Sequence, residues 1–220
     1  HGPTFRHDAY EAYKGTRKPT DERLIPQFPR VKEMLKAMGI GLIEVPSFEA
    51  DYILGTLAAR CEKEGLPALL VTGDRDALQL VTEETHVLYT RRGITDTVEF
   101  DPAKVRESYG VTPAQIPDLK GLMGDSSDNI PGVPGIGEKT AVKLLQAYGT
   151  LEQVLASASQ EKGKLRERLE TYVDQARQSL WLATIDRDAP VEQPLDAFQL
   201  GDLSGGHEAF LALGFKSVLP

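Results

Sequence analysis

The stretch that decides the fold runs from residue 124 to residue 141 and reads GDSSDNIPGVPGIGEKTA. Two carboxylates, Asp125 and Asp128, stand just before a glycine-rich turn, and residues 138–148 then predict a helix that ends at Gly149. Glycines allow the backbone to approach a ligand closely, and amides at a helix N-terminus can meet a phosphate. The GxxxxGK[ST] motif is absent, so the pattern alone favours a helix cap in a tight loop. The acids beside the turn reverse that preference in favour of phosphate.

Two further pairs of acids lie upstream, Glu49 with Asp51 and Asp74 with Asp76. Each pair has an ordinary explanation, because acids also cap helices, occupy their first turns and form turns. Three such coincidences in one small domain are less expected than one. A cluster of carboxylates repels itself unless divalent cations neutralise it, and oxygen ligands favour Mg²⁺ or Mn²⁺ over Zn²⁺. Six acids beside a phosphate-binding turn predict metal-assisted chemistry on a phosphodiester, with two ions sharing the work.

Composition bounds the class of protein. The chain has 220 residues, a net charge of −8 and one cysteine, Cys61, so no internal disulfide can form and an intracellular setting is expected. No apolar run has spanning length, and no signal-peptide pattern opens the chain. Residues 1–36 carry eight Lys or Arg against five Asp or Glu, so a basic front end precedes an acidic remainder. We expect a single compact unit. This distribution of charge fits both a metal-using nuclease and an ordinary acidic protein.

Periodicity predicts an α/β fold with a mostly parallel central sheet flanked by helices, followed by a helical C-terminal part. Residues 1–19 read as a surface segment, and residues 31–38 as an amphipathic helix. A strand at 41–45, a helix capped by Ser47 and a strand at 68–72 buried on both faces give a βαβ rhythm. Expected after these are a helix at 76–81, a hairpin of 86–89 with 98–100, helices opening at Pro102 and Pro113, one long helix over 165–180, and a helix at 207–213.

The segment from Tyr13 to Lys18 places aromatic and basic side chains together, as YKGTRK. Such a segment suits stacking on an unpaired base while a cation holds a phosphate. A solvated basic loop is the ordinary explanation of the same pattern, and the pattern alone favours it. Context therefore has to decide between them.

Together these segments resemble the 5′ nuclease domain of bacterial DNA polymerase I and its flap-endonuclease relatives, from about Pro3 to Leu219. Residues 4–7 with 13–17 are similar to the arch region, and residues 48–51 with 72–76 to the metal-binding acids. Residues 124–137 are similar to the helix-three-turn-helix motif, which grips duplex DNA. The resemblance implies a PIN-like nuclease core over residues 1–110, with its basic arch segment at 1–36, and a helical DNA-binding region over 111–220.

The resemblance also implies roles for individual residues. The six acids would bind two ions, Mg²⁺ or Mn²⁺, while Lys14 and Arg17 would stabilise charge on the scissile phosphate. A potassium ion would sit on backbone carbonyls of the glycine-rich turn. DNA with a 5′ flap, overhang or nick would be recognised by its shape, in the bacterial cytoplasm at the nucleoid, by a monomer without membrane contact and with a polymerase domain attached. The implied DNA contacts are Arg6, Tyr13, Lys18, Gly132, Gly135, Gly137, Lys139 and Thr140.

Two departures from the family pattern leave the activity open. Tyr52 stands where the family has a second aspartate, and the strand with two further metal-ligand aspartates with which the family begins would precede His1. One hypothesis is a structure-specific 5′ nuclease for replication and repair. A second is a DNA-junction binding module with impaired catalysis. A third, a metal-dependent phosphatase or other acid-rich α/β enzyme, predicts turnover of small phosphomonoesters and indifference to the glycine-rich turn.

Overall fold

The computed structural model describes residues 4–93, 95–201 and 203–215. These residues form two compact units rather than the single unit expected from the sequence. The first unit comprises His1–Arg17 and Ser47–Ala189, and it contains the sheet and the predicted acids. The second comprises Lys18–Pro46 and Pro190–Pro220. None of the described helices is long and apolar enough to cross a membrane.

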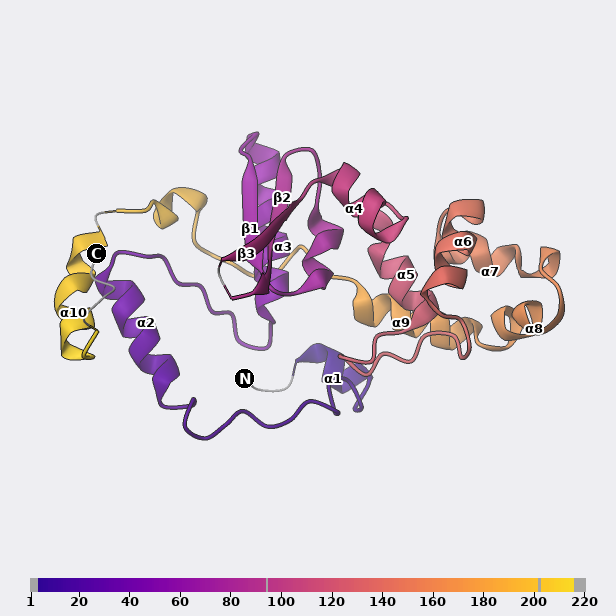
Figure 1. Ribbon diagram of the computed structural model, residues 1–220, viewed down its shortest axis with the longest axis horizontal. Coiled ribbons are helices and arrows are strands. Elements are labelled where there is room, and N and C mark those ends of the chain that lie inside the picture. The colour runs from indigo at the N-terminus through magenta and orange to yellow at the C-terminus, as the bar shows by residue number, and fades with distance from the viewer. Residues whose placement is uncertain (1–3, 94, 202, 216–220) are drawn as a thin grey trace. The chain divides into compact units, whose positions relative to one another are not determined.

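The first unit is an α/β layer followed by a run of helices (Figure 1). Its strands are β1 (Ala68–Thr72), β2 (Thr85–Arg92) and β3 (Asp96–Phe100). β1 pairs with β2 in parallel, with Leu70 opposite Val87, and β2 pairs with β3 as the expected antiparallel hairpin. The sheet is therefore small and mixed. Its helices are α1 (Phe5–Ala9), α3 (Ala50–Glu64), α4 (Pro102–Tyr109), α5 (Ile116–Met123), α6 (Glu138–Tyr148), α7 (Leu151–Ala156), α8 (Gly163–Thr171) and α9 (Val173–Ala183), with 3₁₀ turns η1 (Arg75–Leu80), η2 (Pro113–Gln115) and η3 (Ala158–Gln160).

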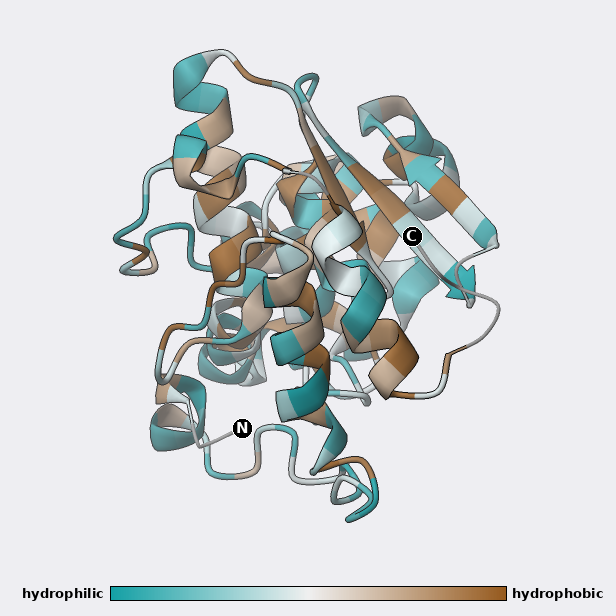
Figure 2. Ribbon diagram, turned by 90° about the vertical axis from the view of Figure 1, so that its left-hand side faces the viewer, coloured by the Kyte–Doolittle hydropathy of each residue, from teal (hydrophilic) through white to brown (hydrophobic). Residues whose placement is uncertain are grey.

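Local chemistry explains several of these boundaries. Asp101 caps α4 by accepting from the amide of Lys104 at 2.6 Å, and Gly110 ends that helix with a φ of 72°. The sequence predicted this helix and the exact span of α6 correctly. Where it predicted an α-helix at 76–81, the chain instead forms the 3₁₀ turn η1 over Arg75–Leu80. The helices are striped, with hydrophobic residues on one side and polar residues on the other (Figure 2).

Strand β1 forms as predicted but is not buried on both faces. Leu70 points inward at 6% exposure, whereas Leu69 and Val71 are 55% and 60% exposed. In the described sheet β1 is an edge strand that pairs only with β2. A run of apolar residues predicts a strand that favours burial, but it does not predict which face of the strand another element covers.

Three other predictions of local structure were wrong. Residues 41–45 form no strand, because no strand of the described chain lies beside them; the backbone at Gly41 instead packs against the ring of Phe198. Ser47 does not cap α3, since Glu49 occupies the N-cap position. The long helix over 165–180 is divided at Tyr172 into α8 and α9. The break falls in a run of weak helix formers, and the apolar stripe continues across it through Leu169 and Ala176.

The second unit holds the predicted amphipathic helix as α2 (Gln27–Ala37). It also contains α10 (His207–Ala212), with 3₁₀ turns η4 (Leu195–Phe198) and η5 (Leu203–Gly206). α10 and η5 both pack against α2. Gly205 allows the closest approach, because a Cβ there would lie 2.3 Å from the carbonyl oxygen of Ala37.

Candidate active site

Three carboxylates converge where β1 ends and α3 begins. Asp74 follows β1 and caps η1, accepting a hydrogen bond from the amide of Asp76 at 2.9 Å. Asp51 occupies the first turn of α3. Burial raises the pKa of Asp51 to about 6, and the neighbouring charges of Asp74 and Asp76 act in the same direction. The capping explanation is therefore right for Asp74, and the three acids also face one another.

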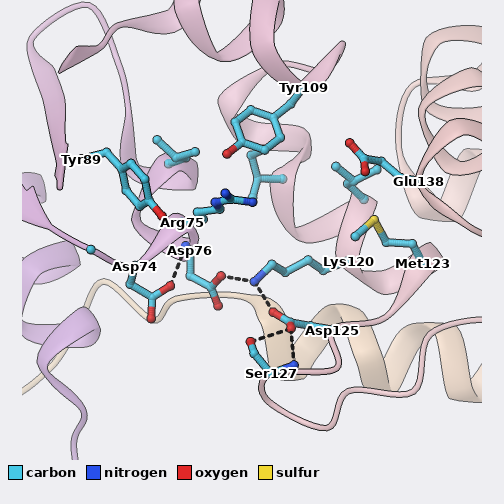
Figure 3. A pocket seen from close by; sticks show the side chains of 14 residues that line it. Asp74, Arg75, Asp76, Tyr89, Tyr109, Lys120, Met123, Asp125, Ser127 and Glu138 are labelled. Atoms are coloured by element: carbon cyan, nitrogen blue, oxygen red, sulfur yellow. Dashed lines mark hydrogen bonds and ion pairs between the residues drawn. The ribbon is translucent and has the colours of Figure 1, made fainter. Parts of the chain in front are cut away.

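Lys120, on α5, joins this group to the glycine-rich stretch (Figure 3). Its ammonium group forms ion pairs with Asp76 and, at 2.6 Å, with Oδ2 of Asp125. Asp125 also accepts hydrogen bonds from the amide and hydroxyl of Ser127, at 2.8 and 2.7 Å. Burial opposes ionisation of Asp125, but the hydrogen bond and charge of Lys120 outweigh it and lower the pKa of Asp125 to about 2. Asp125 is therefore a charged carboxylate held in place by Lys120 and Ser127.

The other two acids are held by the cations predicted to be catalytic. Lys14 forms an ion pair with Glu49, and its Nζ lies 3.7 Å from Oδ2 of Asp128. Arg17 donates to Oδ1 of Asp128 at 2.5 Å. The backbone amide of Lys14 also donates to the carbonyl oxygen of Asp128, at 2.9 Å, with Lys14 at a φ of 55°. The basic segment is thus fastened to the acid-rich loop by backbone as well as by charge.

Tyr13 and Arg6 lie inside the fold, so the prediction of a surface segment over residues 1–19 was wrong for them. Their exposures are 1% and 4%. Arg6 donates to the hydroxyl of Tyr13 at 2.7 Å, and that hydroxyl donates to Oδ2 of Asp128 at 3.2 Å. The Arg6 guanidinium also lies over the ring of Tyr52, 4.8 Å from its centroid. In this structure both side chains position the site, and a DNA contact by either one remains a prediction.

A metal ion has carboxylate oxygens available here, although they are shared with ammonium groups. Among the described residues, no three His, Cys, Asp or Glu side chains lie close enough together to hold a metal ion. The six acids outnumber the three cations among them, Lys14, Arg17 and Lys120. Burial is the main cause of the raised pKa of Asp51, and the charges of the neighbouring acids add to it. An all-oxygen, electron-rich donor set of this kind fits a hard divalent cation.

Lys120 is the participant that the sequence analysis missed. It lies on α5, whose other inward residues include Ile116, Leu119 and Leu122. A single lysine among buried apolar residues, five positions before a predicted metal ligand, is the signal that could have identified it. A buried lysine needs a carboxylate partner, and the nearest predicted acids were the obvious candidates.

The glycine-rich turn is anchored from behind by two helices. The amide of Gly132 donates to the hydroxyl of Ser179 at 3.0 Å, and its carbonyl accepts from Gln175 at 2.7 Å. Arg168 donates to the carbonyl oxygen of Gly135 at 2.9 Å. Gly137 caps α6 and is exposed, and a Cβ there would meet no atom within 4 Å.

The remaining predicted contacts are exposed but differ in position. Lys139 is exposed in the first turn of α6, next to the partly buried Thr140. Both could approach a phosphate at the turn. Lys18 is also exposed but belongs to the second unit, so it is not part of the site described here.

A cavity of about 410 Å³ opens beside the acids and extends toward α6. Asp74, Asp76, Lys120 and Asp125 line one end, and Glu138 of α6 lies at the other (Figure 3). The walls between them are formed by strand β2 and helices α4 and α5. The acids and the helix that follows the glycine-rich turn therefore share one open space.

Two family models together cover residues 1–205. Residues 1–110 match the 5′-3′ exonuclease N-terminal resolvase-like domain, and residues 111–205 match the 5′-3′ exonuclease C-terminal SAM fold. The chain belongs to the 5′-3′ exonuclease family. This membership confirms the resemblance seen in the sequence. The two matched domains also account for the order of the fold, an α/β part followed by helices.

Individual relatives agree with this assignment. The exonuclease-family chain is 53% identical to DNA polymerase I of Bacillus caldotenax over 219 residues, which is 98% of this chain and 25% of that protein. It thus spans about a quarter of the length of such curated relatives. Its fold matches that of T5 5′-exonuclease with bound zinc, with a TM-score of 0.71, 21% identity, and coverage of 84% of this chain and 71% of that one. A pseudo-enzyme-product complex of the T5 D15 flap endonuclease with DNA and metal ions matches with a TM-score of 0.70, 21% identity, and coverage of 96% and 75%.

Proposed function

We propose that this chain is a structure-specific 5′ nuclease that hydrolyses phosphodiesters at 5′ flaps and 5′ ends of DNA, in replication and repair. The observation that carries the proposal is the Lys120 bridge, which joins the acids after β1 to Asp125 beside the glycine-rich turn. Family membership supports the same chemistry. The nuclease would act in the bacterial cytoplasm at the nucleoid, as a monomeric unit attached to a polymerase domain like that of its relatives.

The acids would hold the metal ions, and the cations beside them would hold the substrate. Glu49, Asp51, Asp74, Asp76, Asp125 and Asp128 are the proposed ligands of two ions, Mg²⁺ or Mn²⁺. When bound, such ions activate a water molecule and stabilise the leaving oxygen. Lys14 and Arg17 now neutralise Glu49 and Asp128. Metal on those carboxylates would release both cations to bind the scissile phosphate.

The glycine-rich turn would hold the duplex. Gly135 and Gly137 keep side chains away from the exposed part of the turn, so that amides can meet backbone phosphates without reading sequence. Gly132, predicted as a third contact, is buried with its amide bonded to Ser179, so it would support the turn instead. Lys139 and Thr140 would add contacts from α6. A potassium ion on the turn's carbonyls is the part with the least support, because the carbonyls of Gly132 and Gly135 already accept hydrogen bonds.

A second candidate is a DNA-junction binding module with impaired catalysis. The observation favouring it is that lysine ammonium groups pair with the acids. In the described part of the chain, no three possible ligands lie close enough together to hold a metal ion. The buried ring of Tyr52 beside Asp51 adds no ligand there. This module would grip flap DNA through the turn and leave it uncut.

Cleavage of a 5′-labelled flap substrate in Mg²⁺ or Mn²⁺, together with binding in Ca²⁺, separates the two candidates. The variants are Asp74→Asn and Asp125→Asn, with the exposed Asp174→Asn as the matched control. Metal-dependent cutting near the junction that only the first two variants abolish would support the nuclease. Binding without cutting would support the module, and absence of binding would exclude both.

A further inference from the structure

The wall of the cavity between its two acidic ends has a composition that the proposed mechanism does not use. Arg75, Tyr89 and Tyr109 line it, from η1, β2 and α4. The guanidinium of Arg75 lies between the two tyrosine side chains, whose hydroxyls point toward it (Figure 3). Three elements distant in sequence therefore direct hydrogen-bonding groups to one place.

Arg75 is a cation without a carboxylate partner in the described structure. No acid of the described residues lies within ion-pair distance of it, whereas Arg17, Arg177 and Arg187 all bind carboxylates. Its Cζ lies 5.8 Å from the centroid of the Tyr89 ring. The hydrogen bond with Tyr89 raises the pKa of Arg75, so the side chain stays charged. In a chain with 33 acids and 25 basic residues, an unpaired guanidinium on a cavity wall is an available anion site.

The chemistry of this cluster suits a phosphate. A guanidinium presents a planar fork that matches two phosphate oxygens, and phenol hydroxyls can donate to a third. Carboxylates occupy the rest of the cavity: Asp74 and Asp125 at one end and Glu138 at the other. Their repulsion would keep an anion close to Arg75 rather than elsewhere in the cavity.

Position identifies which phosphate could bind. The acids that would hold the metal ions at the scissile phosphate line the same cavity as Glu138, the first residue of α6 after the glycine-rich turn. A strand with its scissile bond at the acids and its duplex on the turn has to cross this space. The backbone phosphates on the duplex side of the bond would then pass over Arg75.

We propose that Arg75, with the hydroxyls of Tyr89 and Tyr109, binds one backbone phosphate of the cleaved strand on the duplex side of the scissile bond. This inference rests on the proposed function and adds a subsite to it. The contact sets how far the strand advances, and therefore which bond meets the acids.

The test is to neutralise single phosphates in the DNA and single residues in the protein. A fluorescent flap substrate carries one methylphosphonate at a time along the first few duplex-side linkages, and binding is measured in EDTA, so that no metal or catalysis is needed. For the unmodified protein, one position is expected to lose about tenfold in affinity, the low end for a charge-assisted hydrogen bond. Arg75→Gln should bind natural DNA about tenfold more weakly. In this variant, the methylphosphonate at that position should cause no further loss of affinity.

Two controls make the result specific. Arg106→Gln removes an exposed arginine of α4 that does not line the cavity, so it should keep the methylphosphonate effect. Tyr109→Phe keeps the ring and removes the hydroxyl. In this variant, the methylphosphonate at the same linkage should lower the affinity by less than it does in the unmodified protein. Arg75 is exposed, and circular dichroism would establish that its variant folds.

The possible results separate this inference from the proposed function. If the unmodified protein does not bind flap DNA, both fail. The phosphate subsite alone is overturned if the unmodified protein binds flap DNA and Arg75→Gln binds it equally well. It is also overturned if Arg75→Gln binds more weakly but still shows the full methylphosphonate effect at every linkage. An affinity loss caused by removing a base from the strand, in place of a charge, would also overturn it, because the cavity would then hold a nucleobase.

Discussion

The hydroxyl of Tyr13 donates to Oδ2 of Asp128 at 3.2 Å, connecting a buried aromatic residue near the N-terminus to an acid beside the glycine-rich turn. The same hydroxyl accepts from Arg6 at 2.7 Å. Replacing Tyr13 with Phe keeps the buried ring and removes both bonds. We expect the free energy of unfolding to fall by about 1–3 kcal/mol, the cost of leaving buried polar groups unsatisfied, as measured by urea denaturation.

Tyr10→Phe is the control for that loss. Its ring packs against the same cluster of Tyr13, Ile130, Leu182 and Ala183, but its hydroxyl bonds to none of the described residues. It should unfold like the unmodified protein. Equal stability of both variants would contradict a structural role for the Tyr13 hydroxyl.

Removing the cation of Lys120 should destabilise the chain and increase its response to divalent cations. Lys120→Met leaves Asp76 and Asp125 without the ammonium group that they share, and breaking such a partly buried pair costs on the order of 3 kcal/mol. Added Ca²⁺ should restore more of the melting temperature in this variant than in the unmodified protein, since the metal no longer competes with the ammonium. Thermal denaturation with and without Ca²⁺ measures both effects.

Lys104→Met is the matched control for Lys120. Lys104 pairs with Glu107 at 2.8 Å on the exposed face of α4, where such pairs contribute about 0.5 kcal/mol or less. Its melting temperature should hardly change, with or without Ca²⁺. An identical Ca²⁺ response in all three proteins would argue against metal at Asp76 and Asp125.

Two glycines of the turn should respond differently to alanine. Gly132 has a φ of 60°, and a Cβ there would lie 2.1 Å from the amide nitrogen of Gly124, so Gly132→Ala should unfold at markedly lower temperature. Gly137 has a φ of −98° and free space, so Gly137→Ala should melt normally. Its methyl group should nonetheless weaken flap binding several-fold if this surface meets phosphate. Normal binding by a normally folded Gly137→Ala would remove Gly137 from the interface.

Asp118 should make stability depend on pH in a predictable direction. Burial raises its pKa above 3.8, although its carboxylate accepts from the amide of Leu151 at 2.8 Å. The folded state therefore holds the proton more tightly than the unfolded state, and stability falls as pH rises from about 3.8 through the folded pKa. Asp118→Asn should raise the melting temperature at neutral pH and have no effect well below 3.8.

An exposed acid provides the comparison for Asp118. Asp174→Asn changes the same functional group at an exposed position of α9. Its melting curve should follow that of the unmodified protein across the whole pH range. A neutral-pH gain equal to that of Asp118→Asn would assign the effect to net charge instead of burial.

The sequence predicted those elements whose signals are local. Asp101 and Gly110 mark both ends of α4, and Gly149 follows α6, because caps and stops depend on a few neighbouring residues. It failed where the outcome depends on distant partners. The strand expected at 41–45 has no neighbour to pair with in the described chain, and the break at Tyr172 lies inside an unbroken apolar stripe.

The candidate site divides in the same way. The acids were found because their type and spacing carry a chemical meaning, and the structure brings Asp51, Asp74 and Asp76 within reach of one another's charge. The burial of Tyr13 could not be read from its basic surroundings, since its partners, Asp128 and Leu182, lie more than a hundred residues away. Lys120 required knowledge of which acids α5 would face.

The free edge of β1 has a consequence for handling this polypeptide. Leu69 and Val71 hold their methyl groups in water beside a strand whose outer side is unpaired in the described sheet. Burying apolar surface stabilises an association by about 25 cal/mol per Å². Edge strands also pair readily with another strand. Two copies can gain on both counts by meeting along this edge. We expect this pairing to limit the concentration at which the chain stays monomeric, and Leu69→Lys should raise that limit.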